Sequence, residues 1–337
     1  MVNSLDYSHP VARIRVLENK LINSNQIERL VDSKEPKAFF EVLSDSAYAN
    51  HFNLTDNPSE FQKIINQEIK QTKFFLEKNN PFPDQLDWLW LKYDVLNIKS
   101  AIKYKLSNQD ISPEKLSDLG SINKDKIIKS VYNIDKTKLD IEFQDMIDQS
   151  IQAFKKNSDP RIIDQIIDKS YFKILHQKLS QVKSRKIKEY IKSKIDLYNI
   201  KLIFRNKSLA TNKKLFSQYV VNGGNISKSD IIKSYDDHLE NIEKNLKFFT
   251  YRKLLQLSLE YFTKYNSFIL FEKLSYDFLI DQLRFAKYEP FGIEPLVGYF
   301  LAKDNEAKLL RIIMISKINN IESNIIHQQL RKLYLER

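Results

Sequence analysis

Two parts of this sequence are near copies of each other, in the same order and at almost the same separation. Residues 94–99 read DVLNIK and residues 196–201 read DLYNIK, at an offset of 102 residues. A second pair of similar segments follows at residues 120–130 and 224–234, at an offset of 104. A repeat constrains a fold more than a single motif does, because it defines the unit from which the fold is built. This period exceeds the roughly 33–47 residues of the common helical solenoids and favours small subdomains instead.

Weaker copies of the same pattern lie at the two ends of the chain. Ile22 and Ile27 have the spacing of the isoleucines in the strong copies, and residues 13–15 (RIR) open a helix as residues 97–99 do. Residues 306–311 repeat the order of acidic, aliphatic and basic positions. We therefore predict three similar helical subdomains in a pseudo-threefold arrangement, with the C-terminal helix closing the first. The predicted subdomains are residues 1–93 with 305–337, residues 94–195, and residues 196–304.

Apolar residues recur three and four positions apart along most of the chain, which is the pattern of helices with one buried face. Three clear faces lie within residues 61–75, 162–167 and 239–259. Ser59 and Gln62 are placed to form a capping box for the first of these helices. The strict alternation that is typical of strands is rare and never sustained. The sequence therefore predicts an all-α fold.

Glycine is scarce. The chain has five glycines in 337 residues, where average usage would give about 24. This scarcity disfavours all-β sandwiches and barrels, which need many tight turns, and nucleotide sites built on glycine loops. Neither GxGxxG nor GxxxxGK[ST] occurs. Gly120 and Gly224 lie at equivalent positions of the two strong copies, and we predict that they are helix C-caps or turn residues with positive φ.

The sequence contains no pattern of a catalytic or metal site. It has no cysteine, which excludes disulfides, thiol nucleophiles and cysteine-ligated metals. Its five histidines are scattered, without HExxH, and GxSxG is absent. No run approaches the roughly 18 apolar residues of a membrane-spanning helix, and no signal peptide is recognisable. We predict a protein that is not an enzyme, with no catalytic, cofactor-binding or metal-binding residue.

The polar positions of the repeat have two interpretations. They could form a binding site that is repeated three times, or they could be structural. An aspartate in the first turn of a helix complements the helix dipole, while asparagine and lysine can hold neighbouring helices. We favour the structural interpretation for the whole set: Arg15, Asp94, Asn97, Lys99, Asp196, Asn199, Lys201 and Arg311.

Positive charge is concentrated in one segment. Residues 171–215 contain 13 lysines and arginines and two acids, an excess equal to the net charge of +11 of the whole chain. Such a field attracts an acidic protein, anionic lipid or nucleic acid, although a solvated helix face is the simpler alternative. The candidate electrostatic interface consists of Lys183, Arg185, Lys186, Lys188, Lys192 and Lys194.

Several of these segments resemble the C-type subunit of the prokaryotic V-type (A/V-type) ATPases, the family related to the d-type subunit of the eukaryotic V-type ATPases. The opening residues 7–34 (YSHPVARIRVLENKLINSNQIERLVDSK), the DxxNIK segments and residues 294–303 (EPLVGYFLAK), followed by residues 306–311, carry the resemblance. It covers about residues 5–335. Leu309 departs from the family pattern, which often has asparagine there, so a polar contact at that position would be missing.

The resemblance implies a funnel-shaped, all-helical rotor subunit with no catalytic role and no cofactor. Such a subunit holds the central shaft, made of D- and F-type subunits, on the membrane rotor ring. It transmits the torque that couples ATP hydrolysis or synthesis to H⁺ or Na⁺ translocation. We expect a peripheral location on the cytoplasmic face of the membrane, no small-molecule substrate and no nucleic acid. The alternatives are a basic helical nucleic-acid-binding protein and a helical scaffold that binds a partner peptide.

Overall fold

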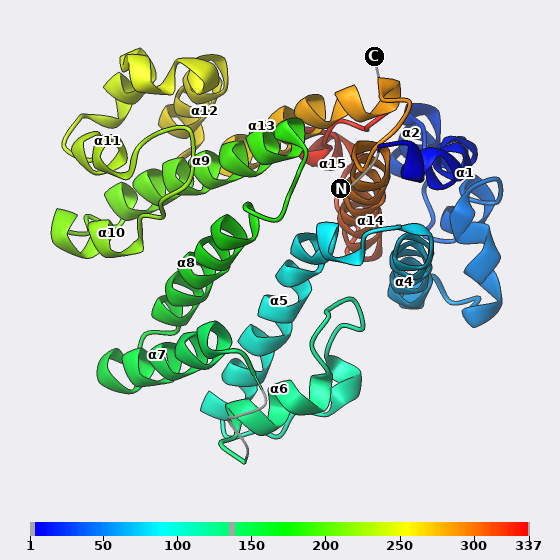
Figure 1. The fold of residues 1–337 in the computed structure, drawn as a ribbon. Helices are drawn as coiled ribbons and strands as arrows, with labels where there is room; N and C mark the ends of the chain where they lie inside the picture. The colour runs from blue at the N-terminus through cyan, green and yellow to red at the C-terminus, as the bar shows by residue number, and fades with distance from the viewer. Residues whose placement is uncertain (1–3, 135–138, 336–337) are drawn as a thin grey trace. The chain divides into compact units, whose positions relative to one another are not determined.

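The computed structural model describes residues 4–134 and 139–335 of the chain, and this part contains α-helices, 3₁₀-helices and no strand (Figure 1). The predicted all-α fold is confirmed. The chain forms two compact units, Met1–Pro83 with Glu243–Arg337 and Asp84–Ile242. The division into three subdomains remains a prediction.

The first unit joins the two ends of the sequence around one long helix, α14 (Glu294–Ile318). This helix contacts α1, α2 and α4 from the N-terminal part of the chain, and Figure 1 shows it in orange beside the blue and teal helices. Residues on all sides of α14 are buried, which is typical of a central helix rather than a surface helix. The other α-helices of the unit are α1 (Ser8–Glu18), α2 (Ser24–Asp32), α3 (Ala38–Val42), α4 (Phe61–Asn79), α12 (Arg252–Tyr265), α13 (Ile269–Leu283) and α15 (Ser323–Gln329).

The second unit contains two long helices, α5 (Asp87–Leu106) and α9 (Arg185–Ser208), each followed by shorter helices. Helix α5 contacts α6 (Lys124–Val131), α7 (Ile141–Asn157) and α8 (Pro160–Lys178). Helices α7 and α8 form a hairpin, in which the side chain of Asp159 accepts a hydrogen bond from the backbone of Arg161 and caps α8. Helix α9 contacts α10 (Lys213–Tyr219) and α11 (Lys228–Lys233). The predicted helix at residues 162–167 is therefore confirmed.

Two local predictions are wrong. The Ser59–Gln62 capping box is absent, because a 3₁₀ turn at Pro58–Glu60 precedes α4 and Asn57 Oδ1 instead accepts a hydrogen bond from the backbone of Ser59, at 3.0 Å. Residues 239–251 form two 3₁₀-helices, Leu239–Lys244 and Leu246–Tyr251, before α12 begins. Ile242, Phe248 and Tyr251 are buried while Phe249 is exposed. Burial thus follows a period of three, the repeat of a 3₁₀-helix.

Candidate functional site

The repeat corresponds to one contact that occurs three times. A carboxylate on a long helix accepts a hydrogen bond from the backbone N–H of an isoleucine just before a short helix. Asp94 Oδ1 lies 2.8 Å from Ile122 N, and Asp196 Oδ1 lies 3.0 Å from Ile226 N. Glu306 Oε1 lies 2.6 Å from Ile22 N. All three carboxylates are buried, and hydrogen bonds to charged groups are stronger than neutral ones.

An asparagine adds a second contact in two of the copies. Asn97 accepts a hydrogen bond from the backbone N–H of Ser117 at 2.8 Å and donates one to its carbonyl at 2.9 Å. Asn199 makes the same pair of bonds with Val221, at 3.0 and 2.9 Å. In the third copy the equivalent residue is Leu309, which is fully buried and has no polar side-chain atom. This copy therefore relies on apolar packing where the others use an amide.

Gly120 and Gly224 are required for a reason that differs from the prediction. Neither has positive φ; among the described glycines only Gly223 and Gly292 do. A Cβ atom on Gly120 would lie 2.2 Å from Asp94 Oδ1, and one on Gly224 would lie 2.0 Å from Asp196 Oδ1. The absence of a side chain thus lets the loop approach the carboxylate. In the third copy the acid is the longer Glu306, and the equivalent loop position is Lys20.

A lysine eleven residues after each acid makes a third repeated contact, which sequence reasoning missed. Lys105 donates to the carbonyl of Val131 at 2.5 Å, and Lys207 to that of Asp237 at 2.5 Å. Lys317 donates to the carbonyls of Val31 and Ser33. These bonds tie the end of a short helix, or the turn after it, to the long helix. The identical spacing was visible in the sequence, but the carbonyl partners are not determined by any side chain.

The remaining repeat positions also contact other parts of the chain. Lys99 forms an ion pair with Asp164 at 2.8 Å, and Arg311 donates to Gln62 Oε1 at 3.0 Å. Arg15 donates to the carbonyls of Ala286 and Glu289 and pairs with Glu18. Lys201 is exposed on α9 and also has an interaction partner.

A buried ionic network joins α4 to α14 in the first unit. Lys303 is 0 % exposed, and its Nζ lies 3.0 Å from Glu306 Oε2 and 3.3 Å from Glu68 Oε1. His51 Nε2 lies 3.0 Å from Glu68 Oε2, and Tyr48 donates to Glu306. Burial raises the pKa of Glu306, with Lys303 opposing that shift. Burial by itself would raise the pKa of Glu68 as well, but hydrogen bonds from His51 and Lys303 outweigh it and hold this pKa below the usual value.

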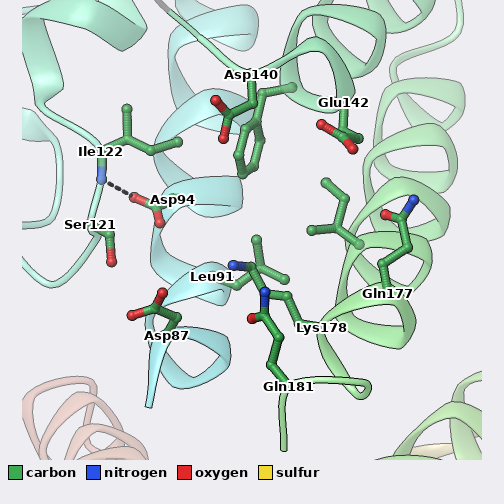
Figure 2. A pocket seen from close by; sticks show the side chains of 12 residues that line it. Asp87, Leu91, Asp94, Ser121, Ile122, Asp140, Glu142, Gln177, Lys178 and Gln181 are labelled. Atoms are coloured by element: carbon green, nitrogen blue, oxygen red, sulfur yellow. Dashed lines mark hydrogen bonds between the residues drawn. The ribbon is translucent and has the colours of Figure 1, made fainter. Parts of the chain in front are cut away.

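A cavity of about 440 Å³ lies in the second unit beside the Asp94 contact (Figure 2). Of the described residues, Asp87, Asp94, Asp140 and Glu142 contribute carboxylates to its wall, and Lys178 contributes a cation. Burial raises the pKa of Asp87, and the charge of Lys178 opposes this shift. Asp94 Oδ1 is occupied by the N–H of Ile122, so this side of the cavity is part of the repeat contact.

The candidate electrostatic interface lies on α9 and the turn before it. Lys183, Arg185 and Lys186 are exposed, and Lys188 is half-buried. Lys192 forms an ion pair with Glu189 at 2.9 Å, and Lys194 donates to the hydroxyl of Tyr171 at 2.7 Å. The six positions are therefore not equivalent, because Lys192 and Lys194 bind these side chains and Lys186 also has an interaction within the chain.

Residues 4–134 and 139–335 include no group of three or more acidic or histidine side chains placed to hold a metal ion. Within that same part of the chain, no helix combines the length and the apolar character needed to cross a membrane.

A family model of the ATP synthase (C/AC39) subunit matches residues 10–329. The chain belongs to this family. Members are structural subunits of the A/V-type ATP synthase complex and not its catalytic subunit. The sequence resemblance to this family is therefore confirmed.

Two relatives illustrate how far the similarity extends. The chain is 23 % identical to the C-type subunit of the A-type ATP synthase of Methanocaldococcus jannaschii, over 99 % of this chain and 88 % of that protein. It is 21 % identical to the C-type subunit of the V-type sodium ATPase of Enterococcus hirae, over 97 % of this chain and 98 % of that protein. Both alignments span nearly the whole chain, so the similarity is not confined to the repeat segments.

Proposed function

We propose that this chain is a non-catalytic rotor subunit that seats a central shaft of D- and F-type subunits on a membrane ring. The subunit transmits torque and thereby couples ATP hydrolysis or synthesis to H⁺ or Na⁺ translocation, from a peripheral position on the cytoplasmic face. The observation that carries this proposal is the family match over residues 10–329.

The repeated contacts support this role physically. Torque passes through a part only if its helices do not shift under load. In each copy, a buried carboxylate and a lysine bind backbone groups of the segment that packs against the long helix. Hydrogen bonds between backbone groups and charged side chains are costly to break where the site is buried, as at Ile22 and Ile226, because the released group would lose its partner without gaining water. Each copy is thus stiffened at both ends of its short helix.

The candidate electrostatic interface supports attachment to an anionic surface. Arg185, Lys186 and Lys188 lie in the first turn of α9, which contains no acidic residue. Positive charge at a helix N-terminus is unfavourable by about 0.3–1 kcal/mol for each group. Stability of the helix therefore does not account for these residues. We propose that they face acidic loops of the ring or lipid headgroups.

The test is a comparison of membranes with and without this chain. We expect a tagged copy, purified from solubilised membranes, to recover the headpiece ATPase subunits and the ring together. In membranes from cells that lack the chain, ATP hydrolysis should persist while ATP-driven ion transport is lost, and re-expression should restore the coupling. Recovery of the chain with nucleic acid, or with a cytosolic complex that contains no ATPase subunit, would contradict the proposal.

A further inference from the structure

We propose that a second cavity, among α7, α8, α9 and α10, binds a small molecule that carries a phosphate group. The cavity lies within the unit Asp84–Ile242 and has a volume of about 640 Å³. Small-molecule sites typically have volumes of about 300–1,000 Å³. No residue of the candidate electrostatic interface and none of the eight repeat positions lines it. The inference does not depend on the proposed rotor function.

The wall of the cavity carries an excess of positive charge. Lys156 on α7, Lys169 on α8 and Arg205 on α9 come from three different helices. None of them forms an ion pair with a residue in the described ranges. Among the described residues the wall has one acid, Asp159. Arg161 Nη2 lies 3.0 Å from Asp159 Oδ2, and Arg205 attracts this carboxylate from a longer distance. The cavity therefore presents three cations that have no carboxylate at ion-pair distance in the part of the chain that the structure describes.

Lys169 is a cation of the wall whose charged form is disfavoured by its surroundings. Its side chain is half-buried. Burial, together with the charges of Lys228 and Lys173, lowers the pKa of its ammonium group. A bound anion would oppose both effects, because it would supply an opposite charge at short range.

The other lining groups indicate the kind of anion. A phosphate carries a charge of about −1.5 to −2 at neutral pH and three acceptor oxygens, so it can bind several cations and neutral donors at once. The neutral donors of the wall include Gln149, Gln165, Thr211 and Gln218. Apolar side chains from α8, α9 and α10 complete it: Ile162, Ile166, Leu209 and Leu215. This composition suits a phosphomonoester, whose organic part would lie against the apolar wall, better than inorganic phosphate.

The experiment is a calorimetric titration of the full-length chain with glycerol phosphate, inorganic phosphate and vesicles that contain phosphatidic acid. We expect saturable binding of a phosphomonoester that weakens about tenfold in Lys156→Gln and in Lys169→Gln. Lys214→Gln is the matched control, because Lys214 is exposed on α10 and does not line the cavity. Binding of soluble glycerol phosphate would identify a free metabolite as the ligand, and binding of vesicles alone would identify a lipid headgroup.

Two results would overturn the proposal. One is the absence of saturable binding for all three probes. The other is binding that Lys156→Gln and Lys169→Gln leave unchanged. Lys156 is exposed, so its substitution is expected to preserve the fold, and thermal unfolding followed by circular dichroism checks this.

Discussion

At the scale of single residues, the loop glycines and the buried acids form matched pairs. Asp94 and Asp196 are short, so the loop must come close to the helix to reach them, and only Gly120 and Gly224 leave room. Glu306 has one more methylene group and occurs with Lys20, which already carries a side chain. The identity of the acid thus determines which residues the loop tolerates.

Gly224→Ala should strongly destabilise the chain. The new Cβ would lie 2.0 Å from Asp196 Oδ1. It would push the carboxylate from the N–H groups of Asn225 and Ile226. We expect a loss of about 2–4 kcal/mol, from overpacking together with broken buried hydrogen bonds. The measurement is the urea midpoint of unfolding. Lys20→Ala at the equivalent position is the control and should change stability by less than about 0.5 kcal/mol; equal losses in both variants would disprove the matched-pair explanation.

Ala210→Gly should stabilise the chain. Each of the helices α5, α9 and α14 is followed, two positions after its last residue, by a residue with positive φ. These residues lie fourteen positions after the repeat acid: Asn108 (φ 54°), Ala210 (φ 50°) and Asn320 (φ 54°). Alanine is strained in this conformation, whereas glycine is not and asparagine tolerates it. We expect a gain of up to about 1 kcal/mol in the free energy of unfolding. Asn320→Ala should lower the free energy of unfolding. A lower urea midpoint for Ala210→Gly than for the unmodified chain would show that Ala210 is not strained.

At the scale of elements, buried charges decide which helices stay together. The Lys303 network joins α14 to α4, and removal of its cation leaves Glu68 and Glu306 buried side by side. We predict that Lys303→Met lowers the free energy of unfolding by about 3–5 kcal/mol. Lys63→Met is the control, because Lys63 and Glu60 form an exposed pair whose loss should cost far less. Chemical denaturation of both variants gives the comparison. Similar small losses would show that the network contributes little.

The contact of α5 with α8 should depend on pH. Burial of Asp164 opposes its ionisation, but Lys99 and Lys103, at 2.8 and 3.0 Å, outweigh this and hold its pKa below the usual value. A carboxylate with a lowered folded-state pKa adds stability above its unfolded pKa of about 3.9 and loses it as the pH falls through the folded pKa.

Asp164→Asn should therefore lower the stability of the chain at pH 7 by at most about 1 kcal/mol, because the group is partly exposed. The difference from the unmodified chain should vanish once the pH falls below the folded-state pKa of Asp164. The measurement is thermal unfolding as a function of pH. A difference that stays constant down to that range would exclude the ion pairs as its source.

At the scale of the whole molecule, the uneven charge distribution predicts how the subunit attaches. Lys183, Arg185 and Lys188 have no ion-pair partner within the described ranges. Reversing all three to glutamate should release the chain from ring-containing membranes at low salt, where the unmodified chain stays bound. Added salt should release the unmodified chain as well, because exposed charges are screened within about 10 Å at 0.1 M salt. Co-sedimentation at several salt concentrations measures both effects.

The control for this experiment carries the same change of charge elsewhere. Lys34, Lys37 and Lys126 are lysines outside residues 171–215 with at least partly exposed side chains. Their reversal to glutamate should leave attachment nearly unchanged if position matters more than net charge. Equal release of both triple variants would show that attachment depends on net charge alone and not on the candidate electrostatic interface.

The helical class, the repeat and the family all follow from the amino-acid sequence alone. These properties depend on local patterns: apolar residues three and four positions apart, six-residue segments such as DVLNIK, and the absence of glycine-loop motifs. Each of them is read over a few neighbouring residues. The α-helix predicted from apolar spacing at residues 239–251 is wrong, because the periods of an α-helix and a 3₁₀-helix differ too little to be distinguished over so short a segment.

The roles of the repeated polar residues, by contrast, depend on how the helices pack. The bond from Ile22 to Glu306 joins residues 284 positions apart, and the lysines eleven residues after each acid bind carbonyls, which every residue has. Glycine is likewise needed at positions 120 and 224 because of a carboxylate that is far away in the sequence but close in space, and not because of the backbone angles of these residues. These contacts depend on distances between separate helices. Sequence patterns describe neighbours along the chain, so they do not contain those distances.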